Sequence, residues 1–154
     1  MIHNLAIILR SLETGGTEKQ AVELACNIDK TKFLPRIITF YDRGELIQVA
    51  REAGINVSIL GKRGQFDLIG FAFKLSAELN AFKPTLVHSF LDSPNIILAI
   101  SKLLGYRFGL IWGIRSSSME ISKYKKARQI GEYLEALLSK VPNKIVCNSH
   151  AGQA

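Results

Sequence analysis

The sequence contains few of the residues that would indicate a disulfide-stapled, fibrous or membrane-spanning protein. Its 154 residues include only two cysteines, four prolines and one tryptophan. Cys26 lies in a helical pattern and Cys147 in a strand-like run, which indicates buried, reduced thiols rather than a disulfide framework. No run of about 18 apolar residues suggests a membrane-spanning helix, and no basic leader precedes the first apolar run. We therefore expect a cytoplasmic protein.

Several motifs of nucleotide and metal chemistry are also missing. The sequence has no G-x-G-x-x-G dinucleotide fingerprint, no G-K-[ST] of a P-loop and no Asp-x-Asp pair. The two cysteines show no metal-ligand spacing. We therefore expect neither a metal nor a bound cofactor.

The charge of the chain is strongly positive. Twenty Lys and Arg oppose 13 Asp and Glu, which gives a formal net charge of +7, and 47% of the residues are hydrophobic. This composition suits one compact domain over residues 1–154 with an anionic partner. This positive charge would attract a phosphate-bearing substrate, an anionic membrane surface or nucleic acid. Nucleic acid is the weakest candidate and is not expected, because the sequence shows neither a recognition helix nor an aromatic and basic sheet surface.

The hydrophobic pattern predicts strands that alternate with helices. Strands are expected over residues 5–9, 33–41, 56–60, 85–90, 108–112 and 144–148. Helices are expected over residues 18–29, 45–53, 66–82, 94–104 and 125–139. Near-continuous apolar strands joined by helices are typical of an α/β fold with a doubly wound, mostly parallel, Rossmann-like sheet. The chain stops just after the last strand, so we expect either a truncation or one half of a longer protein.

The first strand-to-helix junction carries a pair of glycines. In an open parallel sheet, this loop is the usual approach to a phosphate. Gly15 and Gly16 permit positive φ and a close approach of the backbone to a ligand, and Thr17 or its neighbour can cap the helix whose free amides would face an anion. The functional interpretation is a loop that contacts a diphosphate. The alternative is a tight turn whose glycines merely avoid strain.

Four segments together resemble a known family. GGTEKQAVELA is similar to the G-G-[AT]-E-[RK]-x-x-x-x-L-A motif of GT-B fold glycosyltransferases of family 4. PTLVHSFLDSPNIILAI resembles the family's strand that ends in a histidine motif, FGLIWGIRSSS its next strand and acceptor loop, and KIVCNSHAGQA the segment that closes its N-terminal domain. The segments follow the family's order and cover nearly the whole chain.

The resemblance implies that residues 1–154 are the N-terminal, acceptor-binding domain of a retaining glycosyltransferase of the hexosyltransferase type, with the C-terminal donor-binding domain absent. The complete enzyme would transfer a sugar from a nucleotide-sugar donor, a substrate rather than a cofactor, to a glycan or lipid-linked acceptor. Polysaccharide biosynthesis is the implied setting. The missing half would carry the paired glutamates, so this chain alone is expected to be inactive.

The resemblance also implies roles for single residues. Gly15, Gly16 and Thr17 would lie against the donor diphosphate. His88 and Arg115 would be catalytic, and Ser89, Asp92 and Ser116 would bind the acceptor. These residues also have structural interpretations. His88 could be a hydrogen-bonded histidine in the core, Asp92 could cap the helix near Pro94, and the serine of the acceptor loop could be a plain loop residue. Arg115 stands where many relatives have a histidine, and an arginine could instead clamp a phosphate on the acceptor.

Two basic groups could face an anionic membrane from its inner side. Lys62 and Arg63 lie near Phe66, Phe71 and Phe73, and a second group comprises Lys123, Lys125, Lys126 and Arg128. A solvated charged face is the alternative. A competing function is a non-catalytic, flavodoxin-like α/β binding module, which would bind its partner tightly without a second half.

Overall fold

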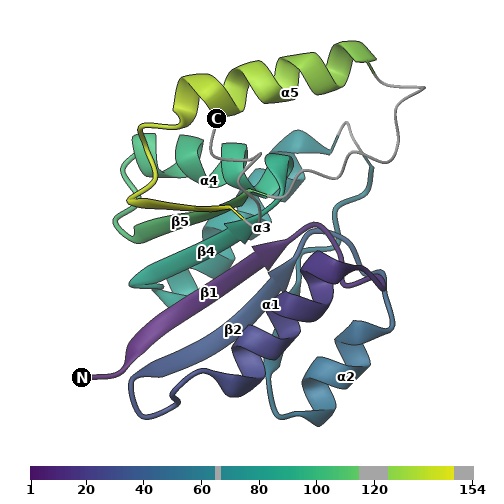
Figure 1. The fold of residues 1–154 in the computed structure, drawn as a ribbon, viewed down its shortest axis with the longest axis vertical. Helices are drawn as coiled ribbons and strands as arrows, with labels where there is room; N and C mark the ends of the chain where they lie inside the picture. The colour runs from purple at the N-terminus through teal and green to yellow at the C-terminus, as the bar shows by residue number, and fades with distance from the viewer. Residues whose placement is uncertain (65–66, 115–124, 148–154) are drawn as a thin grey trace. The chain divides into compact units, whose positions relative to one another are not determined.

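The computed structural model describes residues 1–64, 67–114 and 125–147, and for residues 68, 125–129 and 132 it describes only the backbone. Strands and helices alternate along the chain (Figure 1). The strands are β1 (His3–Leu9), β2 (Phe33–Thr39), β3 (Asn56–Ile59), β4 (Leu86–Phe90), β5 (Gly109–Ile114) and β6 (Lys144–Cys147). The helices are α1 (Gly16–Asn27), α2 (Leu46–Glu52), α3 (Leu68–Phe82), α4 (Asp92–Leu103) and α5 (Lys125–Leu138).

The six strands form one parallel sheet in the order β3-β2-β1-β4-β5-β6. This is the strand order of the Rossmann fold, so the predicted fold class is confirmed. The register of β1 against β2 runs from His3 opposite Phe33 to Leu9 opposite Thr39. Contacts along the chain divide it into two compact units, residues 1–87 and residues 88–154.

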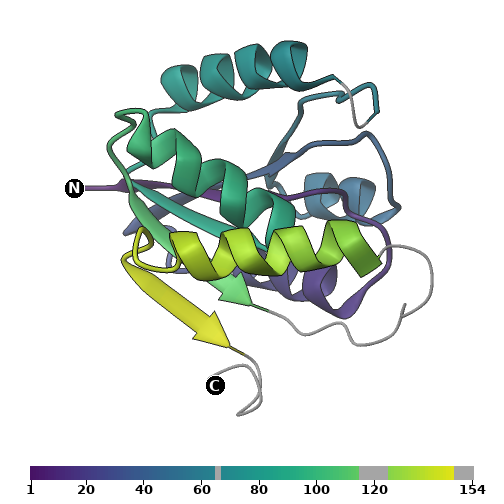
Figure 2. The same ribbon diagram turned by 90° about the horizontal axis from the view of Figure 1, so that it is seen from above.

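The first unit is a sheet segment covered by helices on both faces. Helices α1 and α2 lie on one face of strands β1 and β2, and α3 lies on the opposite face (Figures 1 and 2). Strand β1 is buried from Leu5 to Leu9, as expected for a parallel strand that helices cover on both sides. The continuous apolar run in the sequence therefore reflects burial on both faces.

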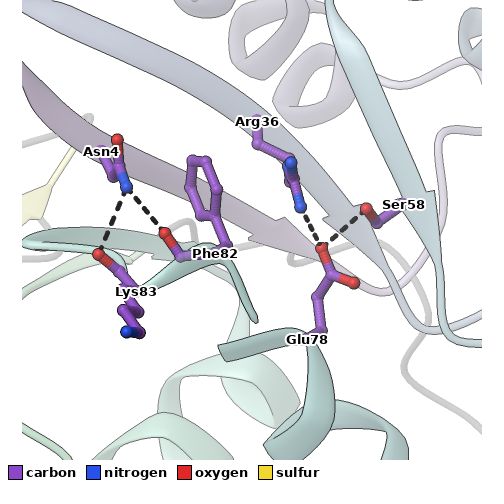
Figure 3. A network of polar contacts seen from close by, with 6 residues as sticks. All are labelled: Asn4, Arg36, Ser58, Glu78, Phe82 and Lys83. Carbon is purple, nitrogen blue, oxygen red and sulfur yellow. Dashed lines mark hydrogen bonds and ion pairs between the residues drawn. The ribbon is translucent and has the colours of Figure 1, made fainter. Parts of the chain in front are cut away.

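A polar network holds α3 against the first unit's strands (Figure 3). Glu78 of α3 accepts hydrogen bonds from Arg36 Nη1 of β2 and from Ser58 Oγ of β3, each at 2.8 Å. The Arg36 guanidinium also lies over the Phe82 ring, 4.2 Å from its centroid. At the end of α3, Asn4 of β1 donates to the carbonyl oxygen of Phe82 at 2.7 Å. One helix is thus anchored to all three strands of the unit.

The second unit contains β5 and β6, with α5 beside α4 in both views (Figures 1 and 2). Trp112 and Leu110 of β5 and Leu98 of α4 are fully buried. Asn95 Nδ2 of α4 donates to Glu135 Oε1 of α5 at 3.0 Å, which ties the two helices together.

The elements appear in the predicted order, but two helices begin earlier than expected. Helix α1 begins at Gly16 rather than at residue 18, and α4 begins at Asp92, two residues before Pro94. A proline is tolerated in the first turn because its missing N–H has no helical partner there. Cys26 is a free thiol. Among the described residues, no helix combines the length and apolar character that crossing a membrane requires.

Candidate functional site

The loop after β1 brings Gly15, Gly16 and Thr17 to the N-terminus of α1. Gly15 is the N-cap with extended backbone (φ −146°, ψ 164°), and Gly16 is the first helical residue. Neither Gly15 nor Gly16 has positive φ, so neither uses the left-handed backbone that glycine permits. The predicted cap by Thr17 is also wrong, because this residue lies inside the first turn and no side chain caps the helix.

The N-terminus of α1 suits an anion. The first helical hydrogen bond runs from Lys19 N to the Gly15 carbonyl oxygen at 3.0 Å, so the amides that precede Lys19 have no partner within the helix. No side-chain hydrogen bond replaces such a partner. Amides without helical partners and the positive end of the helix dipole favour a negative group, and the Glu18 carboxylate already lies in this first turn beside Gly15.

The two glycines differ in the space beside them. A Cβ added to Gly15 would lie 2.2 Å from the Glu18 carboxylate, whereas no atom of the described residues lies within 4 Å of a Cβ added to Gly16. The chain's own described packing therefore does not require a glycine at position 16. A ligand that approaches the helix N-terminus would find room at Gly16.

The loop that carries these glycines is held in place by the loop after β2. Leu12 N donates to the Arg43 carbonyl oxygen at 3.0 Å, and the Leu12 carbonyl oxygen accepts from Leu46 N at 3.2 Å. Thr14 Oγ1 donates to the Glu45 carboxylate. Gly44, at φ +110°, packs against the Leu12 backbone so closely that an added Cβ would lie 2.0 Å from the Leu12 carbonyl carbon. The loop that carries Gly15 and Gly16 is therefore fixed by tertiary contacts.

Sequence reasoning missed Gly44. Its position in the turn DRG, directly after a strand, is a signal for a residue with special backbone geometry. The adjacent Gly15 and Gly16 were the more conspicuous pair, but Gly44 is the glycine that the fold requires.

Three basic side chains surround Tyr41 at the carboxyl ends of the first unit's strands. The guanidinium carbons of Arg10 and Arg43 lie 5.9 Å and 5.4 Å from the centroid of the Tyr41 ring. Lys62 Nζ lies 5.8 Å from the same centroid and 5.9 Å from that of Phe71. Arg10 follows β1, Tyr41 and Arg43 follow β2, and Lys62 follows β3. We refer to Arg10, Arg43 and Lys62 as the Tyr41 cluster.

In the second unit, His88 lies within β4 rather than at its end. The strand continues to Phe90, and the imidazole of His88 stacks on the Phe90 ring with centroids 4.2 Å apart. The residue as a whole is half-buried, but its Nε2 atom is buried. This placement provides a histidine packed on an aromatic ring, close to the carboxyl end of a parallel strand.

Ser89 is fully buried and hydrogen-bonded inside the second unit. Its hydroxyl donates to Asn95 Oδ1 at 2.6 Å, and Asn95 in turn donates to Glu135. Asp92 is the exposed first residue of α4, where an acidic side chain suits the helix dipole. The expected role of Asp92 as a helix cap is wrong, because Leu91 occupies the N-cap position with no side-chain hydrogen bond.

Several predicted site residues lie outside the described part of the chain. Arg115 and Ser116 are among them, as are Phe66 and Lys123 of the two basic groups, while only the backbone of Lys125, Lys126 and Arg128 is described. Of the aromatic residues expected beside Lys62 and Arg63, Phe71 faces the core at 4% exposure, whereas Phe73 is 74% exposed. No group of metal-ligating side chains occurs in the described residues.

The fold is similar to that of two solved glycosyltransferases of the GT-B class. The structure of Anabaena Alr3699/HepE in complex with UDP and glucose matches with a TM-score of 0.72 and 16% identity, over 98% of this chain. The structure of Acinetobacter baumannii MurG matches with a TM-score of 0.66 and 13% identity, over 94% of this chain. The matches cover 39% of the HepE chain and 41% of the MurG chain, so this chain spans about two fifths of either length.

Comparison of the sequence alone with known proteins finds no relative. No protein-family model matches the chain, and no curated protein matches it. The likeness is therefore one of fold.

Proposed function

We propose that this chain is the acceptor-binding, N-terminal domain of a retaining glycosyltransferase of family 4, which transfers a hexose from a nucleotide sugar to a glycan or lipid-linked acceptor. The observation that carries the proposal is the uncapped N-terminus of α1 with open space beside Gly16. A fold similar to that of a protein crystallised with UDP and glucose supports it. The activity belongs to the complete two-domain enzyme.

The proposed role of the first unit is to stabilise the leaving diphosphate. As the bond between the sugar and the diphosphate breaks, negative charge grows on the phosphate oxygens. Fixed amides at a helix N-terminus stabilise that charge without having to reorganise during the reaction. Because the glycine loop is already held by Gly44 and Glu45, little loop entropy would be lost when the donor binds.

The proposed role of the second unit is to hold the acceptor. His88 and Arg115 are proposed as the catalytic residues, and Asp92 and Ser116 as acceptor ligands. Since the Ser89 hydroxyl is buried against Asn95, we assign Ser89 to the support of the β4 end rather than to direct acceptor contact. Since His88 Nε2 is buried, Nδ1 is the ring nitrogen proposed to accept or donate a hydrogen bond to a sugar hydroxyl.

A membrane surface is the proposed location of the acceptor. On α3, Ile69 is 77% and Phe73 is 74% exposed, and with Ala72 and Ser76 they line a groove of about 320 Å³. Lys74 on the same helix is also exposed. Exposed apolar side chains beside basic ones are typical of surfaces that bind anionic lipid from the cytoplasmic side.

Membrane binding is tested by sedimentation with vesicles of phosphatidylglycerol and phosphatidylcholine. We expect Phe73→Ser to reduce binding to anionic vesicles severalfold, with Val49→Ser on α2 as a matched exposed control. Equal binding by both variants would contradict the proposed membrane location. It would not bear on the proposed glycosyltransferase activity.

The activity is tested by measuring nucleotide-sugar hydrolysis and transfer by the 154-residue chain and by any longer product of the same reading frame. We expect turnover only in a longer product and expect Gly16→Val to lower it at least tenfold. Gly131→Val is the matched control, because Gly131 is also helical with no atom of the described residues within 4 Å of an added Cβ. If no product turns over a nucleotide sugar, the non-catalytic binding module replaces the proposal.

A further inference from the structure

The Tyr41 cluster gathers positive charge at one edge of the first unit. Its three cations come from three loops, and each lies within 6 Å of one aromatic ring. A fourth cation lies nearby, because Lys74 Nζ donates to the Gly61 carbonyl oxygen at 3.3 Å. Like charges repel one another. Contact with the face of Tyr41 offsets only about 0.5–1 kcal/mol of that repulsion per exposed cation. The arrangement therefore favours an anion that neutralises it.

Carboxylates of the described residues do not neutralise the cluster. The ion pairs among them join Lys32 to Asp29 and Arg36 to Glu78, and neither involves the cluster. On the same loops, Glu13 accepts a hydrogen bond from Ser11, Glu45 accepts one from Thr14, and Asp42 is exposed without an ion pair. The charge of the three cations is therefore available to a ligand.

The backbone around the cluster is held in place before any ligand binds. The Arg10 carbonyl oxygen accepts from Tyr41 N at 2.9 Å, the Arg43 carbonyl oxygen accepts from Leu12 N at 3.0 Å, and Lys62 N donates to the Phe40 carbonyl oxygen at 2.8 Å. Lys62 Nζ also donates to the Gly64 carbonyl oxygen. A site whose loops are already ordered loses less entropy on binding than one that must fold around its ligand.

The chemistry of the three side chains favours a phosphate group. Guanidinium groups bind phosphate oxygens through paired hydrogen bonds, and an ammonium adds a compact positive charge. The position also agrees, since ligands of open parallel sheets bind beyond the carboxyl ends of the strands. Arg10, Arg43 and Lys62 follow three neighbouring strands at that edge.

We propose that Arg10, Arg43 and Lys62 form a binding site for the phosphate group of a phosphorylated acceptor. The assignment to an acceptor, rather than to the donor, rests on the proposed function, in which the donor diphosphate uses a different group of residues at Gly16. The acceptor is then a sugar phosphate or a glycan carried on a phosphate, and a neutral glycan would lack the group that this site recognises.

The test is a titration of the chain with glucose 1-phosphate, followed by NMR chemical shifts, with and without saturating UDP. We expect Arg10→Gln, Arg43→Gln and Lys62→Gln each to weaken glucose 1-phosphate binding about tenfold, and Arg43→Lys to retain part of it. Lys30→Gln is the control, because Lys30 is exposed on the loop between α1 and β2, at the opposite edge of the sheet. We expect that UDP does not compete with glucose 1-phosphate. We also expect that the affinity of UDP is the same for these variants as for the unaltered chain.

The outcomes separate the site from the proposed function. If glucose 1-phosphate binding is lost in the cluster variants but no longer product of the reading frame turns over a nucleotide sugar, the phosphate site stands and the proposed function is in doubt. If UDP competes and its own affinity falls in the same variants, the cluster holds the donor diphosphate and the acceptor assignment is overturned. Equal affinity for glucose 1-phosphate in the cluster variants and in Lys30→Gln overturns the site. Unchanged melting temperatures exclude unfolding as the cause of any loss.

Discussion

The α-carbon of Gly44 faces the peptide that joins Leu12 to Glu13. An added Cβ would lie 2.0 Å from both the carbonyl carbon and the carbonyl oxygen of Leu12, and 2.1 Å from Glu13 N. The first two atoms belong to Leu12, a buried residue whose backbone is held by hydrogen bonds to Arg43 and Leu46. The loop after β2 therefore acts as a rigid support for the loop that carries Gly15 and Gly16.

Gly44→Ala is predicted to be strongly destabilising. The substitution combines a left-handed backbone, φ +110°, with a clash against backbone that cannot rotate away. We expect the free energy of unfolding to fall by about 2–4 kcal/mol, measured by chemical denaturation.

Gly54→Ala is the matched control for this prediction. Gly54 also has positive φ, +78°, but no atom of the described residues lies within 4 Å of an added Cβ. Only the strain of the left-handed backbone applies at Gly54. We therefore expect the free energy of unfolding to fall by about 1 kcal/mol. Equal losses in the two variants would mean that the contact with Leu12 contributes nothing.

The comparison of these glycines shows why the fold was predictable and the details of the loop were not. Apolar runs such as residues 5–9, separated by helical patterns, specify buried parallel strands locally. The turn DRG marks Gly44 locally, but its close approach to Leu12, a residue distant in sequence, could not be predicted from local rules. The Tyr41 cluster was missed for the same reason, because Arg10, Arg43 and Lys62 become neighbours only when β1, β2 and β3 align.

Glu78→Ala is predicted to loosen α3 from the sheet. Glu78 accepts from both Arg36 and Ser58, and the side chains of Arg36 and Glu78 are 25% and 20% exposed. Removing the carboxylate leaves a largely buried guanidinium without its counter-ion, for which we expect a loss of about 2–3 kcal/mol. Lys32→Ala, which breaks a pair whose side chains are 72% and 45% exposed, is expected to cost less than about 0.5 kcal/mol. A loss for Glu78→Ala as small as that control would show that α3 is held by apolar packing alone.

Asp29 is predicted to titrate below its ordinary range. The hydroxyl of Thr31 donates to its carboxylate at 2.5 Å, and Lys32 and the Thr31 amide add further stabilisation of the charged form, so the pKa of Asp29 is lowered. The folded pKa is depressed, so this carboxylate stabilises the fold above its unfolded pKa of about 3.9. That contribution is lost as the pH falls through the folded pKa.

Thr31→Val tests this pKa by NMR titration of the Asp29 carboxyl. The substitution removes the hydroxyl, which contributes most to the lowering, and should raise the pKa of Asp29 toward its ordinary value. Ser139→Ala, a change of another exposed hydroxyl that donates elsewhere, should leave this pKa unchanged. An Asp29 pKa that is the same in Thr31→Val and in the unaltered chain would contradict the assigned cause.

Asn95 is predicted to hold the end of β4 through a buried polar chain. Asn95 accepts from Ser89 at 2.6 Å and donates to Glu135 at 3.0 Å. Asn95→Ala removes both contacts from a fully buried position, so we expect a loss of about 2–3 kcal/mol in the free energy of unfolding. Ser89→Ala removes one contact and should cost about 1 kcal/mol, while the exposed Ser93→Ala should have no measurable effect.

The same variants test the role of Ser89 in the proposed two-domain enzyme. A supporting serine predicts that Ser89→Ala lowers the melting temperature and leaves the KM for the acceptor nearly unchanged, because its hydroxyl donates to Asn95 inside the second unit. A serine that binds the acceptor predicts the reverse, a raised KM with an unchanged melting temperature. Because its single proton goes to Asn95, the Ser89 oxygen could contact an acceptor only by accepting a hydrogen bond from a sugar hydroxyl. A raised KM would therefore report the loss of that accepted bond, which can coexist with the bond to Asn95.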